Sequence, residues 1–144
     1  MDIEPVTIKL QKGVKLSRQR YYSVPHAFER PLKKEIQRMC AIDVLEKLLH
    51  DDDSPWASPS FCQAKKTGDI RILTDFRKMN AAIQRKPFPL PRIGETIQRL
   101  QKFKSATALD LSQGYYSIPI CKMSQKICTT VLAWGKYAYK RLAM

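Results

Sequence analysis

The acidic residue Asp110, in the stretch LDLSQGYYSIPI, has the type and setting that chemistry at a metal ion or a phosphate requires. It is the single acidic residue among residues 105–144, which carry five Lys or Arg. If residues 106–111 form a strand, Ala106, Ala108 and Asp110 share one face, because side chains alternate along a strand. Small neighbours leave room for a hydrated metal ion or a phosphate, whereas bulky ones would bury the charge at a high cost. The alternative is that Asp110 merely closes a strand and opens the following turn.

A second candidate group is basic and lies on a predicted β-hairpin. Residues 61–66 and 70–76 have the character of two strands that are joined by a short Gly-containing turn. Lys65 and Lys66 approach the turn and Arg71 leaves it, so the hairpin would present cations from both strands at one end. The alternative is an ordinary solvated hairpin end.

The elements that would position these residues are predicted from apolar spacing. Helical spacing indicates helices in residues 26–50 and 93–103, the first with a break near residues 41–43 and a second short turn at 44–49. Residues 86–93, KPFPLPRI, are expected to be extended because three prolines forbid a helix there. Two further strands are predicted, at residues 127–132 and 137–142.

The charge of the chain points to a polyanionic partner. The sequence has 26 Lys or Arg against 13 Asp or Glu, a net charge of +13 that is spread along the chain. Distributed cations gain affinity for nucleic acid by releasing phosphate counterions, whereas a membrane-surface helix would concentrate its charge on one amphipathic stretch. There is no run of 18 apolar residues, and the N-terminus carries charges where a signal peptide has its apolar core. We therefore expect an intracellular protein that is not secreted and has no membrane partner.

The four cysteines do not suggest a metal site. Cys40, Cys62, Cys121 and Cys128 lack paired spacing, and the two histidines do not complete a zinc pattern. We expect reduced, mostly buried thiols.

Five ordered motifs carry a resemblance to a known family: SPWASP, KKTGDIRILTDFRKMN, PFPLPRI, LDLSQGYYSIPI and WGKYAYKRLAM. In this order they resemble the reverse transcriptase of gypsy-type long-terminal-repeat retrotransposons, and more distantly that of retroviruses. The resemblance implies an α+β fold, with the fingers subdomain and the start of the palm of a right-hand polymerase. Residues 1–24 would form an extended arm, 25–104 a fingers-type region with some palm, and 105–144 a partial palm.

The resemblance also implies roles for the candidate residues. Asp110 matches the first catalytic aspartate, which holds two Mg²⁺ ions, and Leu111 offers its carbonyl oxygen to one of them. Either Lys65 or Lys66, together with Arg71, matches the cations that neutralise the triphosphate, and Arg71 also lies over the incoming base.

Three consecutive residues complete the implied nucleotide site. Gln113 and Gly114 match positions whose backbone amides touch the triphosphate. Tyr115 matches the aromatic residue that packs under the sugar and excludes a 2′ hydroxyl, and its alternative is an ordinary core tyrosine. The positions assigned to fold and template-side packing are Trp56, the SPWASP prolines, Asp75, Phe76, Arg77 and Asn80.

The sequence also departs from the family pattern. Cys128 and Val131 flank the paired threonines where other residue types are usual, which suggests a divergent copy. Residues 111–144 contain no Asp or Glu, and the Tyr-x-Asp-Asp motif that completes the metal site in the family is expected beyond Met144.

The expected function is that of a fragment of an RNA-directed DNA polymerase, inactive by itself. Its partners would be an RNA or DNA template-primer, deoxynucleoside triphosphates and other parts of a Pol polyprotein. The alternative is a non-catalytic nucleic-acid-binding remnant of a retrotransposon polyprotein. Reading the genomic sequence after the codon for Met144 for a Tyr-x-Asp-Asp motif would discriminate the two.

Overall fold

A five-stranded sheet forms the centre of the body of the protein. The computed structural model describes residues 3–49, 54–65, 68–100, 104–105 and 107–143. Its strands are β1 (Leu45–Lys47), β2 (Ser58–Ala64), β3 (Ile70–Thr74), β4 (Thr129–Leu132) and β5 (Gly135–Tyr139). Their order in the sheet is β1-β5-β4-β2-β3, in which β2 and β4 run parallel and the other neighbours antiparallel. The predicted mixture of helices and strands is confirmed, as are the two C-terminal strands, although β5 begins and ends earlier than predicted.

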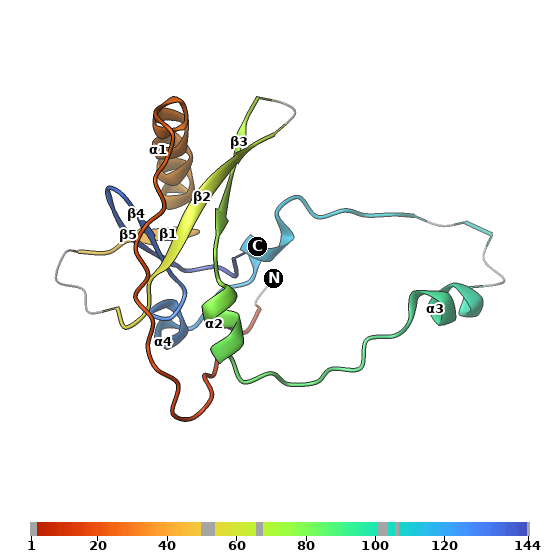
Figure 1. Cartoon of the computed structure of the whole chain (residues 1–144). Helices are drawn as coiled ribbons and strands as arrows, with labels where there is room; N and C mark the ends of the chain where they lie inside the picture. Colours follow the sequence, from red (N-terminus) through yellow and green to blue (C-terminus); the bar gives the residue numbers. More distant parts are fainter. Residues whose placement is uncertain (1–2, 50–53, 66–67, 101–103, 106, 144) are drawn as a thin grey trace.

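The predicted hairpin is present as β2 and β3. Its register runs from Ser60 opposite Thr74 to Ala64 opposite Ile70, and beyond it the Lys65 amide donates to the Asp69 carbonyl at 2.7 Å. The hairpin projects beyond the rest of the sheet, as Figure 1 shows. This geometry carries the side chains near the turn away from the core.

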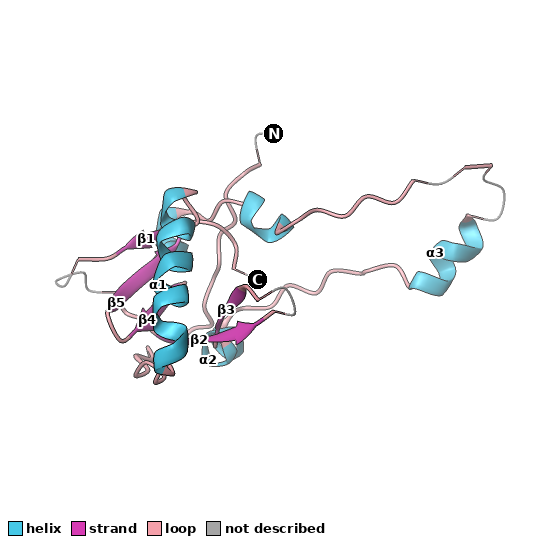
Figure 2. Ribbon diagram, turned by 90° about the horizontal axis from the view of Figure 1, so that it is seen from above, coloured by secondary structure: helices cyan, strands magenta, loops and turns pink. Residues whose placement is uncertain are grey.

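Helix α1 (His26–Ala41) confirms the first part of the predicted helical segment. It contacts β1 and β3 and buries Leu32, Ile36 and Met39, which recur at the spacing of one helix face. Figure 2, a view from above, shows α1 lying across the strands. The buried stripe therefore orients the helix, and Lys33, Lys34 and Arg38 between these residues are exposed.

The second short turn expected at residues 44–49 is wrong, because β1 occupies this part of the chain. Asp43 adopts a left-handed conformation with φ 58°, which ends the helical path. Leu45 then pairs with Tyr139 and Lys47 with Tyr137 on β5. Helical and strand patterns are ambiguous over so few residues, and here the open edge of β5 decides the outcome.

The N-terminal residues run extended across the body (Figure 1). Isolated bridges join Val6 to Ile120, Leu10 to Ile83 and Arg18 to Ala57. The Ile8 amide also donates to the hydroxyl of the buried Ser124 at 2.8 Å. This segment therefore ties together parts of the chain that are far apart in sequence.

Two short helices adjoin strands of the sheet. Helix α2 (Arg77–Ala82) follows β3 and buries Met79 and Ala82, and α4 (Lys122–Gln125) precedes β4. No helix in the described part of the chain is long and apolar enough to cross a membrane.

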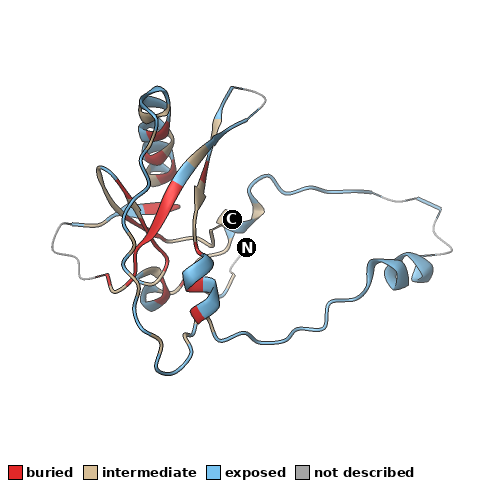
Figure 3. Cartoon of the chain, viewed as in Figure 1, coloured by how far each residue is buried: buried red, intermediate tan, exposed pale blue. Residues whose placement is uncertain are grey.

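Helix α3 (Ile93–Arg99) lies on a long excursion that leaves the body (Figure 1). The helix is present as predicted up to Arg99, and residues 101–103 lie outside the described residues. Its apolar residues Ile93 and Ile97 are 79% and 62% exposed. Figure 3 shows the contrast between this exposed excursion and the buried positions of the sheet and of α1.

The strand predicted at residues 106–111 is not formed. Residues 107–111 are irregular, Leu109 is 90% exposed, and Ala106 lies outside the described residues. A strand requires a neighbour for its amide and carbonyl groups, and no described segment pairs with this one. The alternating residue pattern of this segment was therefore not sufficient to predict a strand.

The core contains buried hydroxyl groups as well as apolar side chains. Ser60 hydrogen-bonds to Thr74 at 2.6 Å and to Thr130 at 2.5 Å, and Thr74 in turn bonds to the Tyr139 hydroxyl at 2.9 Å. Burial raises the pKa of Tyr139 well above its ordinary value. This chain of bonds satisfies polar groups that would otherwise be costly to bury.

All four cysteines are free thiols. Cys128 is buried, and this burial raises its pKa to about 12, whereas the other three are only half-buried. The expectation that most of the thiols are buried is wrong, and their reduced state stays a prediction.

Candidate anion-binding site

A cavity of about 210 Å³ lies between α1, the β2–β3 hairpin and the turn before the 3-10 helix η1 (Gly114–Ser117). It contains three of the residues predicted from sequence, Lys65, Arg71 and Gln113. The other lining residues are Glu35, Met39, Ile70, Ile72, Ser112 and Tyr116. Side chains from three separate parts of the chain thus converge on one site, which we call the inner cavity.

The hairpin register explains how the cations reach the inner cavity. Arg71 lies opposite Gln63 in the ladder, and Lys65 directly follows the last residue of β2. Both lie close to the turn, where the hairpin passes α1. Lys66, the other predicted lysine, lies outside the described residues.

A tight turn supplies Gln113. Its backbone has a left-handed conformation, with φ 54°, and its carbonyl accepts a hydrogen bond from the Tyr116 amide at 2.9 Å. The Gly114 amide donates to the Leu111 carbonyl at 3.3 Å, and a Cβ at Gly114 would lie 3.2 Å from the Cβ of Leu111. Glycine therefore allows the close backbone approach that brings Gln113 beside the hairpin.

The remaining predicted site residues do not line the inner cavity. Asp110 is exposed on the irregular segment, and Leu111 is 78% exposed. Tyr115 is 57% exposed, so it is not a core tyrosine. Gly114 contributes to the turn rather than to the lining.

Two residues that were not predicted from the sequence, Glu35 and Tyr116, shape the electrostatics of the inner cavity. Glu35 accepts two hydrogen bonds from Arg38, at 2.8 Å from Nε and 2.7 Å from Nη2, and this pairing raises the pKa of the Arg38 guanidinium. The pKa of Tyr116 is raised mainly by burial and further by Glu35, while Arg38 and Arg71 oppose the shift. The spacing of Glu35 and Arg38 on a helix could have revealed their pair, but not its place beside the hairpin.

A larger groove of about 510 Å³ adjoins the inner cavity. The two share Glu35, Lys65, Ile70 and Gln113. The groove, which we call the outer groove, is also lined by Pro31, Lys34, Arg38, Gly68 and Asp69. Together the two spaces bring cations from α1 and from the hairpin to one surface, an arrangement suited to an anion with several charges.

Comparison with known proteins finds similarity to retroelement proteins. It is 26% identical to the Retrovirus-related Pol polyprotein from transposon 412 of Drosophila melanogaster over 99% of the chain, and 31% identical to that from transposon gypsy over 66% of the chain. It is 34% identical to the Pol polyprotein of Ovine maedi visna related virus (strain South Africa) over 81% of the chain. Its homologues are Pol polyproteins.

The chain corresponds to a small part of these Pol polyproteins, spanning 12%, 10% and 10% of their respective lengths. No protein-family model matches it. Among solved structures it resembles a foamy viral protease-reverse transcriptase in complex with double-stranded DNA, with a TM-score of 0.74 and 25% identity over 99% of the chain and 23% of that protein. A Prototype Foamy Virus Protease-Reverse Transcriptase matches in fold with a TM-score of 0.82, at 20% identity, over 99% of this chain and 18% of that one.

The donor set at Asp110 does not by itself fit the two Mg²⁺ ions that the reverse transcriptase resemblance implies. Among the residues that the structure describes, no three His, Cys, Asp or Glu side chains are grouped so that they could hold a metal. The Leu111 carbonyl beside Asp110 already accepts the Gly114 amide. Mg²⁺ requires several hard oxygen ligands, and one carboxylate with one carbonyl is too few for two ions.

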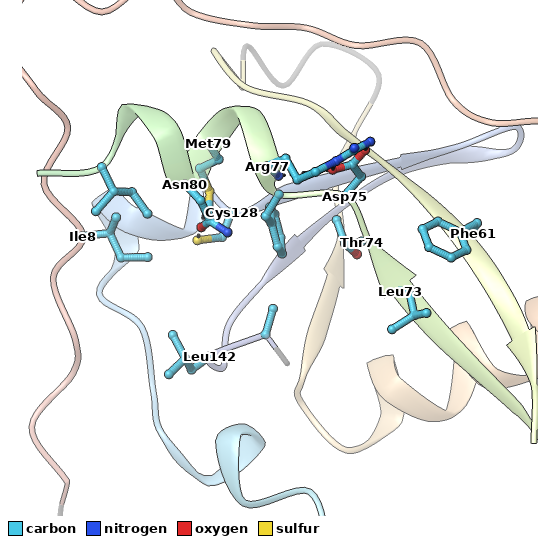
Figure 4. A pocket seen from close by; sticks show the side chains of 13 residues that line it. Ile8, Phe61, Leu73, Thr74, Asp75, Arg77, Met79, Asn80, Cys128 and Leu142 are labelled. Carbon is cyan, nitrogen blue, oxygen red and sulfur yellow. Dashed lines mark hydrogen bonds and ion pairs between the residues drawn. The ribbon is translucent and has the colours of Figure 1, made fainter. Parts of the chain in front are cut away.

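A separate, mainly apolar cavity of about 520 Å³ lies at the end of β3 and the start of α2 (Figure 4). Asp75 stands at its rim and binds Arg77 through two bonds of 2.8 and 2.7 Å, and Tyr22 donates to the same carboxylate at 2.9 Å. These hydrogen bonds, chiefly that from Arg77, hold the pKa of Asp75 well below its usual range. Phe76 is buried, and its ring makes an edge-on contact with the Tyr139 ring, with 5.7 Å between the ring centroids. Asp75 and Arg77 thus form an ion pair, and Phe76 packs in the core.

Proposed function

We propose that this Pol-like chain is the fingers and partial palm of an RNA-directed DNA polymerase and takes part in template-directed nucleotidyl transfer. The observation that carries the proposal is the convergence of Lys65, Arg71 and Gln113 on one cavity. These residues come from both sides of the hairpin and from a distant turn. Their convergence, together with the Pol homologues, supports a nucleotide site better than the sequence motifs alone.

In this proposal the inner cavity receives the triphosphate of a deoxynucleotide. Arg71 suits the role because its planar guanidinium can donate two parallel hydrogen bonds to phosphate oxygens and can also stack on a base. Lys65 adds a point charge, and the backbone amide of Gln113 would hydrogen-bond to phosphate. The Gly114 amide would do so after releasing the Leu111 carbonyl, to which it donates at 3.3 Å. Tyr115 is available to contact the sugar because its ring is largely exposed.

Asp110 would be one of several Mg²⁺ ligands in the complete enzyme. Bound Mg²⁺ would stabilise the attacking and leaving oxygens of the displacement. Because Asp110 supplies a single carboxylate, we propose that residues outside the described ones must complete the set, and no reaction step is assigned to the described residues.

Template-primer binding is part of the same proposal. A structural relative is described as being in complex with double-stranded DNA, and this chain carries a net charge of +13. Cations on both α1 and the hairpin would contact backbone phosphates, which gives affinity without sequence preference.

The test is calorimetric titration of the 144-residue chain with a deoxynucleoside triphosphate. We expect Arg71→Ala to weaken binding about tenfold or more, since a charge-assisted bond to phosphate is lost. Arg30→Ala is the matched control, because Arg30 is exposed on α1 and lines neither the inner cavity nor the outer groove. Equal affinities of the wild type and Arg71→Ala would refute the nucleotide site.

A second candidate function is nucleic-acid binding without catalysis. It is favoured by the lack of a metal-binding group of side chains among the described residues. Both candidates predict binding of an RNA–DNA hybrid that falls at least about tenfold between about 50 and 200 mM salt. The nucleotide titration separates them, because a non-catalytic remnant would bind the hybrid and show no nucleotide affinity that depends on Arg71.

A further inference from the structure

We propose that Arg38 is a further phosphate-binding cation of this site and that Glu35 is its resident counter-anion, which a triphosphate displaces. The inference rests on the proposed function, since it assumes that the inner cavity receives phosphate groups. It adds a cation from helix α1 to the proposed phosphate contacts, which otherwise come from the hairpin and the Gln113 turn.

The sizes of the two spaces argue that a triphosphate must reach α1. Ligand sites usually have volumes of about 300–1,000 Å³, and the inner cavity has only about 210 Å³. A nucleoside triphosphate bound to Arg71 would therefore extend into the outer groove of about 510 Å³. Arg38 and Lys34 are the cations that α1 places along this groove.

Glu35 is the acidic residue that lines both spaces. It thus lies beside the spaces where phosphate groups would bind, and its carboxylate accepts two hydrogen bonds from the Arg38 guanidinium. Asp69 also lines the outer groove but not the inner cavity. Glu35 therefore neutralises the site when no ligand is bound and opposes an incoming anion.

The pair of Glu35 and Arg38 is open to exchange because it is reached by solvent. The side chains of Glu35 and Arg38 are 24% and 43% exposed, so water screens the pair, although its two hydrogen bonds make it stronger than a singly bonded surface pair. A phosphate group carries more charge than a carboxylate and fits the same guanidinium fork. Exchange of Glu35 for phosphate is therefore favourable at Arg38, while the freed carboxylate retains access to water.

The proposal is tested with inorganic tripolyphosphate, which has no base or sugar, by calorimetric titration of the full 144-residue chain. We expect Arg38→Gln to weaken binding about tenfold, because it loses a forked charge-assisted contact, and Glu35→Gln to strengthen it several-fold. Arg38→Lys keeps the charge but loses the fork, so its affinity should lie between those of Arg38→Gln and the wild type.

The control is Lys33→Gln, which removes one positive charge from the same helix. Lys33 lies over the Trp134 ring at 5.1 Å and lines neither the inner cavity nor the outer groove, so the affinity should change less than about twofold. Thermal unfolding of each variant checks that it is folded. An affinity of Arg38→Gln equal to that of Lys33→Gln, or a Glu35→Gln affinity no higher than the wild type, overturns the proposal.

Two further titrations separate the possible outcomes. A deoxynucleoside triphosphate should follow the same order of variants, whereas an oligonucleotide should show no greater effect at Arg38 than at Lys33. If only the oligonucleotide depends on Arg38, the contact is to nucleic-acid backbone and the inference is wrong. If Arg71→Gln abolishes tripolyphosphate binding and Arg38→Gln does not, this inference fails alone; if neither matters, the proposed nucleotide site fails as well.

Discussion

Asp75 illustrates how a single carboxylate can hold an exposed arginine in place. Its carboxylate holds Arg77 with two hydrogen bonds and accepts a third from Tyr22, which belongs to the N-terminal segment. The side chain of Asp75 is only 8% exposed, whereas that of Arg77 is 86% exposed. Asp75 therefore anchors a cation that remains open to solvent and to ligands.

The lowered pKa of Asp75 predicts a pH-dependent contribution to stability. Asp75→Asn should lower the thermal midpoint at neutral pH, because the charged form that the native state favours is lost. Since the native pKa lies below the unfolded value of about 3.9, this contribution is complete above about pH 5 and is lost as the pH falls below about 4. The difference between variant and wild type should then shrink in acid. Glu95→Gln on the exposed α3 is the control, and a difference that does not change with pH would contradict the assignment.

Tyr115 should affect the choice of sugar. If its exposed ring bounds the 2′ position, the wild type should bind a deoxyribonucleotide more tightly than the matching ribonucleotide. Tyr115→Ala should reduce this preference for the deoxyribonucleotide by about tenfold. Paired titrations with dATP and ATP measure this ratio. Equal weakening of both would mean that the ring contributes only general contact.

Helices α1 and α3 show that the same apolar spacing can lead to opposite environments. Ile36 on α1 is 2% exposed, whereas Ile97 on α3 is 62% exposed. The first helix packs on the sheet, whereas the second has no buried residue. Helical periodicity therefore identified both helices but could not distinguish a packed face from an open one.

This contrast predicts different costs for one substitution. Ile36→Ala should lower the free energy of unfolding by about 2–5 kcal/mol, because it leaves a cavity in the core. Ile97→Ala, the matched control, should change it by less than about 0.5 kcal/mol. Urea unfolding followed by circular dichroism measures both. Similar values for the two would show that α3 is packed in solution.

At the scale of the whole molecule, the site is distributed between a packed body and an exposed excursion. The inner cavity belongs to the body, whereas Asp110 lies on the irregular return from α3. The proposed triphosphate contacts and the proposed metal ligand thus lie on parts of the chain that differ in burial. Additional carboxylates and a partner strand for residues 107–111 would be needed to bring them into one reaction geometry.

The 144-residue chain is therefore expected not to extend a primer, even with Mg²⁺, template and all four deoxynucleotides. The physical reason is that one carboxylate in a basic surround cannot hold two divalent ions in the geometry of in-line displacement. Primer extension resolved on a denaturing gel is the measurement. Extension by the purified chain that Asp110→Asn abolishes would show instead that another acid completes the site.

Local patterns in the sequence were sufficient for α1, for the hairpin and for the cations at its tip. The helix follows from the recurrence of Leu32, Ile36 and Met39, and the hairpin from two strands around a glycine turn. Such signals depend on neighbours a few residues away, so they survive in a single sequence. The net charge and the five motifs were equally readable. The charge indicated a polyanionic partner, and the motifs indicated the resemblance to retroelement reverse transcriptases.

Only the tertiary structure decided which segments became strands and which side chains share the site. Residues 45–47 became β1 because β5 offers an edge with free hydrogen-bonding groups, whereas residues 107–111 stayed irregular without a described partner. Glu35 joined Arg71 at the inner cavity because packing brings α1 beside the hairpin. Strand pairing and convergence of this kind depend on contacts between residues far apart in sequence, which local periodicity does not encode.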